Sequence, residues 1–359
     1  MVIKIMNRKI SMASKCVAFW HLEELKKMDD DTKYLDCSHN SLKCIDNLPP
    51  KIKYLNCSHN RIESINGYYQ ELETLYCDGN LLDDICYLPH LRVLTCRDNL
   101  FSSLPLLSSC LVNLFCSSNE IKSIDGLPET LEVLDCSNNW IETINDLPKS
   151  LTRFVCKNNL ITHISYFPKK LEWIDCSNNP LGTLPRIGNY ARTLIIENTN
   201  ISTIPKSKIT TLNCKNCPIV DSRLAKTLTH LVTDTNHMNK IRYLPPKLLL
   251  MGCTIREIVR FPLIPDSVIF LRIIHADDYD PQQCIYEIDQ HEDIDVLRSK
   301  TQTHERFVHL YYSLKYKCKF RNWLWDRVRR PKIERECHPD IIRDIIETNG
   351  MEYFLDMDN

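Results

Sequence analysis

The 359-residue chain carries 45 Lys and Arg residues against 46 Asp and Glu residues, a formal net charge of −1. This balance argues against whole-chain binding to nucleic acid or to a membrane surface. No run of about 18 apolar residues occurs, which excludes a membrane-spanning helix, and residues 1–15 lack the apolar core of a signal peptide. Eighteen cysteines without a secretory signal indicate free thiols in a reducing compartment, so we expect an intracellular, cytoplasmic protein.

Residues 1–31 precede the first repeat and are predicted to form a partly helical N-terminal cap. Phe19, Leu22, Leu25 and Met28 are three residues apart, which places them on roughly one face of a helix. A stack of repeats needs its terminal core layer covered, and an amphipathic segment of this kind can provide the cover.

Residues 32–276 are predicted to form a solenoid of about thirteen repeats with a mean period of about 20 residues. Each unit is numbered from an anchor residue, usually cysteine. Leucine-like residues stand at positions −5 and −2, asparagine at +3 and apolar residues at +5 and +8, often followed by Leu-Pro at +11 and +12. The anchors are Cys37, Cys57, Cys77, Cys96, Cys116, Cys136, Cys156, Cys176, Ile196, Cys214, Thr233, Cys253 and Ile273.

The spacing predicts one short strand in each unit. In the unit of Cys136, alternation places Leu134 and Cys136 on one side of the strand, and Val133 and Asp135 on the other. Parallel stacking of such strands buries the leucine and cysteine columns in a continuous core. The asparagine amide can satisfy backbone groups where the chain leaves the strand, and the proline favours an extended return on the convex side.

The recurrent cysteine is interpreted as a small core residue with one weak hydrogen-bond donor. The alternative is a disulfide or metal ladder, but neighbouring side chains on parallel strands point the same way, which suits neither. Cys214 and Cys217 form a C-x-x-C motif, yet they occupy the anchor and asparagine positions of one unit. His39 and His59 recur at one position and could share a metal, but no third ligand is apparent. We therefore predict neither a metal nor a cofactor.

The units at 35–60 and 134–154 resemble short leucine-rich repeats. Their Cys-Ser-x-Asn motifs (LDCSHN, LNCSHN, LDCSNN) are similar to those of leucine-rich repeat proteins of giant, mimivirus-like viruses that infect amoebae. They resemble more distantly the Leu-Pro-type repeats of bacterial effectors. Residues 319–346 also resemble C-terminal segments of that virus group. The resemblance implies a leucine-rich repeat solenoid that recognises a protein partner, host or viral, in the host cytoplasm.

The side chains at −3, −1 and +1 are predicted to face outward on the concave side. Aromatic residues there have no place in the core, which is typical of a protein-binding surface. The alternative is cross-strand packing that only covers the sheet. We predict partner contacts, with Trp173 as the main anchor, at Tyr34, Asp36, Tyr54, Tyr76, Phe115, Asp135, Arg153, Trp173 and Asp175.

Residues 277–359 are predicted to form a mainly helical C-terminal cap. The segment 315–335 is strongly basic and contains two tryptophans. It could bind nucleic acid or an acidic partner, or it could pack its aromatic side chains on the last repeat and leave the basic face to solvent. No base-reading motif accompanies the charges, so we expect no nucleic-acid partner.

No catalytic constellation is apparent, and we predict a non-enzymatic, monomeric protein-interaction module. The alternative is a ubiquitin-pathway ligase or substrate adaptor, because some effectors with Leu-Pro-type repeats carry a ligase domain with a catalytic Cys-x-Asp motif. Only about 80 residues follow the last unit here, and none of Cys284, Cys318 and Cys337 begins a Cys-x-Asp sequence.

Overall fold

The computed structural model describes residues 14–16, 25, 28–45, 48–220, 224–234, 237, 240–241, 243–255, 264–275 and 287–288. The chain divides into two compact units, Met1–His291 and Glu292–Asn359. All the described residues belong to the first unit, so the predicted helices and the basic segment of the C-terminal region lie outside them. No helix among the described residues is both long and apolar enough to cross a membrane.

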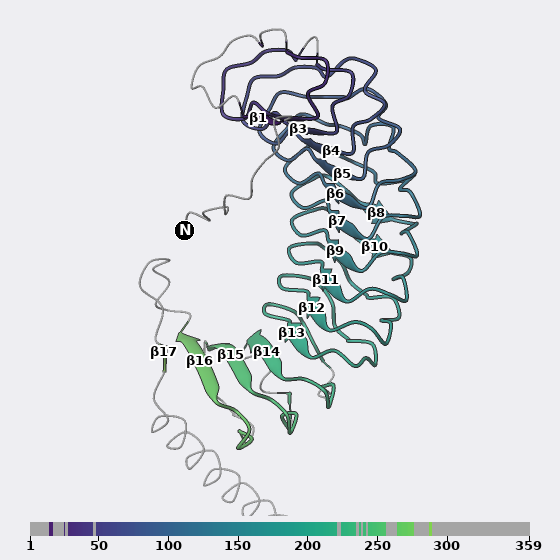
Figure 1. The fold of residues 1–359 in the computed structure, drawn as a ribbon. Coiled ribbons are helices and arrows are strands. Elements are labelled where there is room, and N and C mark those ends of the chain that lie inside the picture. Colours follow the sequence, from purple (N-terminus) through teal and green to yellow (C-terminus); the bar gives the residue numbers. More distant parts are fainter. Residues whose placement is uncertain are drawn as a thin grey trace, which may run out of the picture. The chain divides into compact units, whose positions relative to one another are not determined.

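The first unit is built on one 15-stranded sheet whose strand order follows the chain, with β8 (Thr143–Ile144) and β10 (His163–Ile164) paired separately. Figure 1 shows the sheet along the inner edge of a curved stack and the connecting loops on the outer edge. The strands of the sheet are β1 (Ser14–Cys16), β2 (Tyr34–Asp36), β3 (Tyr54–Asn56), β4 (Thr74–Tyr76), β5 (Val93–Thr95), β6 (Asn113–Phe115), β7 (Val133–Asp135), β9 (Arg153–Val155), β11 (Trp173–Asp175), β12 (Thr193–Ile195), β13 (Thr211–Asn213), β14 (His230–Asp234), β15 (Leu250–Ile255), β16 (Phe270–His275) and β17 (Glu287–Ile288).

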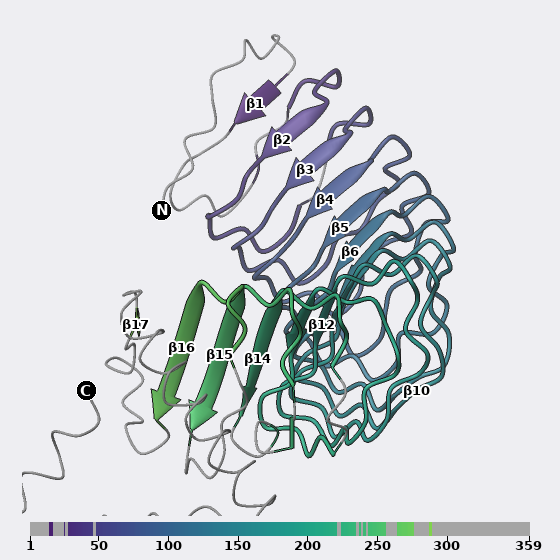
Figure 2. The ribbon, with the colours of Figure 1, turned by 90° about the horizontal axis from the view of Figure 1, so that it is seen from below.

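Neighbouring strands from β1 to β16 are parallel, and equivalent positions of adjacent units pair with each other. Trp173, for example, pairs with Arg153 on one side and Thr193 on the other. Figure 2 shows β2 to β6 side by side with the same direction. Each strand of the 15-stranded sheet from β2 to β16 contains or directly precedes a predicted anchor. The predicted solenoid, with one short parallel strand in each unit of about 20 residues, is therefore confirmed.

The core consists of the columns that the repeat pattern predicts. In one unit Leu131, Leu134, Cys136, Ile141 and Ile144 are all at most 1% exposed. The described cysteines form no disulfide. Burial raises the pKa of the Cys57 and Cys136 thiols, so they remain protonated and can donate. The Cys136 thiol donates to a backbone carbonyl of the next unit at 3.6 Å, which fits a small core residue with one weak donor.

The asparagine at +3 fastens each turn to the preceding one. Asn139 Nδ2 donates to the carbonyls of Cys136, Ser137 and, in the preceding unit, Cys116 at 3.0–3.1 Å. Its Oδ1 accepts from the backbone N–H of Ile121 at 3.0 Å. One buried amide thus satisfies four backbone groups, as the sequence predicted. The buried members of this column are Asn60, Asn80, Asn99, Asn119, Asn139, Asn159 and Asn179.

The sharp bend itself occurs one residue earlier, at +2, which the sequence analysis did not anticipate. Residues at this position adopt a left-handed backbone with φ between 52° and 63°, a conformation that Asn, Asp and Gly tolerate best. They are His39, His59, Gly79, Asp98, Ser118, Asn138, Asn158, Asn178, Asn198 and Asn216. The two histidines of this column stack with ring centroids 4.5 Å apart. A Cβ at Gly79 would lie only 2.7 Å from Nδ1 of His59, so the smallest residue fits beside this stack.

Strands also occur in both predicted caps. β1 pairs in parallel with β2, and Lys15 occupies the position of Leu35. A lysine at the −2 position is the reason that the repeat pattern missed this strand. At the other end β17 pairs antiparallel with β16, within the predicted C-terminal cap. The predicted N-terminal helical face lies largely outside the described residues, since 17–24 are not among them.

Candidate functional site: the concave sheet face

None of the nine predicted contact residues is buried. Tyr34 and Arg153 are exposed, and the other seven are partly exposed. They lie at the −3 and −1 positions of seven strands of the concave sheet face, which we define as the residues at −3, −1 and +1. The prediction that +1 faces outward fails for the serines there, since Ser58, Ser117, Ser137 and Ser177 are buried. The structure brings them together in two groups rather than in one patch.

The first group, the tyrosine cluster, consists of Tyr34, Tyr54 and Tyr76 on β2, β3 and β4. The ring centroids of Tyr34 and Tyr54 are 6.3 Å apart, and those of Tyr54 and Tyr76 are 5.4 Å apart in an edge-to-face arrangement. Burial raises the pKa of Tyr54 to about 12, with smaller contributions from Tyr76 and Asp36. Tyr34 remains 50% exposed, so the cluster presents an aromatic surface to solvent.

The second group, the arginine-aromatic group, occupies the middle of the face. Arg97 lies over the ring of Phe115 with Cζ 4.7 Å from the centroid, and its Nη2 is 3.7 Å from Oδ2 of Asp135. Arg153 lies over Trp173, its in-register neighbour, also at 4.7 Å. The sequence analysis did not select Arg97, although its +1 position was recognised as outward-facing. Its side chain spans two units, a contact that spacing alone does not reveal.

The three aspartates on this face also have a structural function, which the sequence analysis did not anticipate. Asp36 Oδ1 accepts from the backbone N–H and the hydroxyl of Ser38 at 3.1 and 2.7 Å. Asp135 and Asp175 make the same pair of hydrogen bonds with the serine two residues on. Each carboxylate therefore stabilises the exit of its own strand. One oxygen of each is engaged in this way, and the other oxygen of Asp135 reaches Arg97.

A second exposed row was missed. At position +4, beside the left-handed turns, apolar side chains recur in successive units although they contribute nothing to the core. Trp140 is 49% exposed and lies under Lys122, whose Nζ is 5.9 Å from the ring. The recurrence of apolar residues at +4 in the sequence could have revealed this exposed row. The exposed apolar members are Leu81, Leu100, Trp140 and Leu160.

No family model and no curated protein matches the chain. Solved structures do match it. YopM of Yersinia pestis has a TM-score of 0.61 and 25% identity, covering 70% of this chain and 80% of that one. YopM of Yersinia enterocolitica has a TM-score of 0.51 and 21% identity over 71% and 67%. The fold is a leucine-rich repeat fold.

InlJ of Listeria monocytogenes is also similar, with a TM-score of 0.50 and 25% identity. The alignment covers 69% of this chain and 55% of InlJ, whose functional domain includes a cysteine ladder. None of these likenesses identifies a ligand for the concave sheet face.

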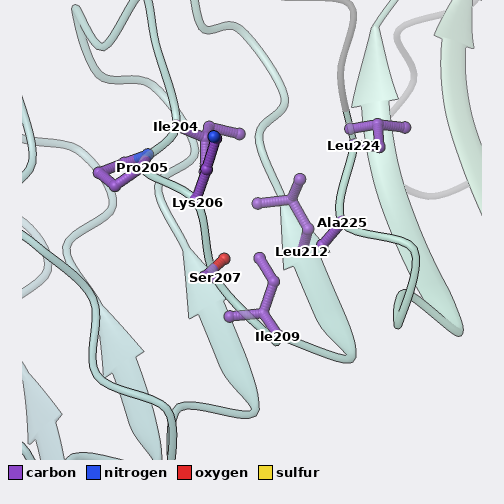
Figure 3. A pocket seen from close by; sticks show the side chains of 8 residues that line it. All are labelled: Ile204, Pro205, Lys206, Ser207, Ile209, Leu212, Leu224 and Ala225. Carbon is purple, nitrogen blue, oxygen red and sulfur yellow. The ribbon is translucent and has the colours of Figure 1, made fainter.

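A cavity of about 160 Å³ is lined by Ile204, Pro205, Lys206, Ser207, Ile209, Leu212, Leu224 and Ala225. Figure 3 shows side chains of consecutive units on opposite sides of it. Pro205 stands nine residues before the anchor, where Leu147 and Phe167 fill the core in earlier units, so the smaller ring leaves space. The lining is mostly apolar, it contains no group suited to catalysis, and residues 221–223 beside it lie outside the described part.

The C-x-x-C motif is explained by the leucine-rich repeat. Cys214 is a buried anchor 3.4 Å from Nδ1 of the buried His237, which also lies 3.0 Å from the Thr233 hydroxyl. Cys217 replaces the asparagine and donates to the carbonyl of Ile196 at 2.8 Å. Burial raises the pKa of both thiols, which makes them poor nucleophiles and poor metal ligands. Among the described residues no group of three potential ligands could hold a metal ion.

Proposed function

We propose that the chain is a non-enzymatic protein-interaction module that binds a protein partner on the concave sheet face. One observation carries the proposal: aromatic and arginine side chains, the types enriched in binding hot spots, stand on a preformed sheet without any role in the core. Trp173 and Arg153 form its centre. A rigid surface loses little conformational entropy on binding, which favours affinity.

The fold and the sequence resemblance support the same reading. YopM of Yersinia pestis, described as a leucine-rich effector protein, shares this solenoid. The Cys-Ser-x-Asn motifs resemble those of giant viruses, so we propose a viral protein that acts as a monomer in the host cytoplasm on a host or viral protein. The ligase, adaptor and nucleic-acid alternatives depend on the tail or on segment 315–335, and no described residue favours them.

Cross-strand packing that only covers the sheet is the competing explanation. It accounts for the contact between Tyr54 and Tyr76, and in-register pairing also brings Arg153 beside Trp173. The guanidinium of Arg153, however, lies over the ring of Trp173. Stacking limits the rotamers of Arg153 and of the indole together, and so presents both in a fixed geometry. A partner that meets this pair loses less side-chain entropy than it would with independent side chains.

Affinity capture from an amoebal lysate tests the proposal. Wild type is compared with a Trp173→Ala, Tyr76→Ala double variant and with Trp140→Ala, a matched control on the +4 row. A partner retained by wild type and by the control, but lost by the double variant, supports binding on the concave sheet face. Partners retained equally by all three proteins place the binding surface elsewhere and contradict the proposal.

A further inference from the structure

On the concave sheet face, two arginines of the chain itself stack on aromatic rings. Arg97 and Arg153 each lie over an aromatic ring, Phe115 and Trp173, with Cζ 4.7 Å from the centroid in both cases. The tyrosine cluster is the third aromatic feature of this face. Among the described residues, no Lys or Arg side chain is found over the rings of Tyr34, Tyr54 or Tyr76, although Tyr34 is 50% exposed.

Two acidic residues stand next to the tyrosine cluster in the repeat. Asp36 adjoins Tyr54, and Asp78 follows two residues after Tyr76, both partly exposed. Asp36 is partly exposed and accepts hydrogen bonds from Ser38 through Oδ1. The basic side chain at the start of β3, Lys53, is paired with Glu73 at 3.0 Å. Aromatic faces and carboxylates both attract cations, so their effects add here.

We infer that the tyrosine cluster binds an arginine side chain of the partner, stacked on Tyr34 and Tyr54 and steered by Asp36. This inference depends on the proposed function and specifies the chemistry of the partner at one end of the same face. The distance from Tyr54 to Trp173 is about 30 Å, since six strand steps of ~4.8 Å separate β3 from β11. An extended partner segment can reach both groups at once, the arginine at one end and the Arg153–Trp173 pair at the other.

A defined peptide tests the inference without the natural partner. The probe is an acetylated octapeptide of alternating Arg and Gly, titrated into the full chain and followed by NMR signals of isotope-labelled tyrosine rings. The matched probe carries citrulline, which has the shape of arginine without its charge. We expect the arginine peptide to shift the tyrosine signals and the citrulline peptide to bind at least several-fold more weakly. Equal binding of the two peptides overturns the inference.

Substitutions separate stacking from general charge attraction. Tyr34→Leu is expected to weaken binding of the arginine peptide by about two- to five-fold, the range for an exposed cation–π contact, whereas Tyr34→Phe keeps the ring and the affinity. Tyr34 is half exposed, so neither change threatens the fold. Trp140→Leu is the control, because that ring stands on the +4 row and not on the concave sheet face, and it already lies under Lys122. If Tyr34→Leu binds like Tyr34→Phe, arginine stacking on the cluster is excluded.

The outcome also distinguishes this inference from the proposed function. If the arginine peptide fails while capture from lysate still depends on Trp173, the face binds a partner but the tyrosine cluster does not take arginine. If capture is also independent of Trp173, the proposed function itself fails.

Discussion

Arg153 stacks on Trp173, its in-register neighbour on the next strand, with Cζ 4.7 Å from the indole centroid. A β-sheet with parallel, in-register pairing places these two side chains together automatically, because the positions are equivalent in adjacent units. Arg153 on β9 is exposed and Trp173 on β11 is partly exposed, whereas Ile174 on β11 and Cys176 directly after it are fully buried. One strand therefore supplies both the core and the surface.

The pair predicts a binding hot spot. Trp173→Ala removes the ring under Arg153, and we expect the affinity for a captured partner to fall about 30-fold, the effect of a 2 kcal/mol hot spot. Thermal stability should change little, because the side chain lies outside the core. Calorimetric titration of purified partner into both proteins measures the effect. A loss below about two-fold would remove Trp173 from the interface.

We expect that substitution of an asparagine in the buried column at +3 strongly lowers the stability of the fold. Asn139→Ala leaves three carbonyls and one N–H without their side-chain partner inside the core. Each such group costs about 1–3 kcal/mol when unsatisfied, so we expect a loss of at least about 2 kcal/mol. The midpoint of urea unfolding reports it. Asn138→Ala, at the exposed neighbouring position, is the control and should cost less.

At the left-handed position +2, we expect two substitutions of the same residue to have different effects on stability. Asp98 has a φ of 52° and an exposed side chain. Asp98→Val should destabilise the fold by about 1–2 kcal/mol because a β-branched side chain clashes in this conformation, whereas Asp98→Gly should be neutral or stabilising. The midpoints of chemical denaturation of the two variants test this expectation. Equal midpoints would show that the backbone at +2 is not under this constraint.

Sequence periodicity predicted the strands because the core columns alone determine their register. It could not predict the left-handed position, since His39, Gly79, Asp98 and Ser118 share a backbone conformation but no side-chain chemistry. It missed β1, where a lysine occupies the leucine position. Contacts across two units, such as that of Arg97 with Asp135, depend on the length and direction of the side chains. The spacing of residues in the sequence gives neither.

The buried cysteines predict instability in alkaline solution. Burial raises the pKa of Cys116 from 9.0 to about 12. Between these two values the unfolded chain loses the thiol proton and the folded chain keeps it, so the stability of the folded state falls as pH rises. The slope is about 1.4 kcal/mol per pH unit for each such thiol, present in full below pH 9 and lost towards pH 12.

Lysines and tyrosines also titrate in this range, so the thiol contribution must be isolated by substitution. Cys116→Ala should lower the stability at neutral pH because it removes a buried sulfur, yet reduce the loss between pH 9 and pH 12 by about 1.4 kcal/mol per unit. Cys110→Ala, at an exposed cysteine, should leave the slope unchanged. Urea midpoints across this range test both expectations. Parallel curves for wild type and Cys116→Ala would mean that the anchor thiol ionises in the folded chain as easily as in water.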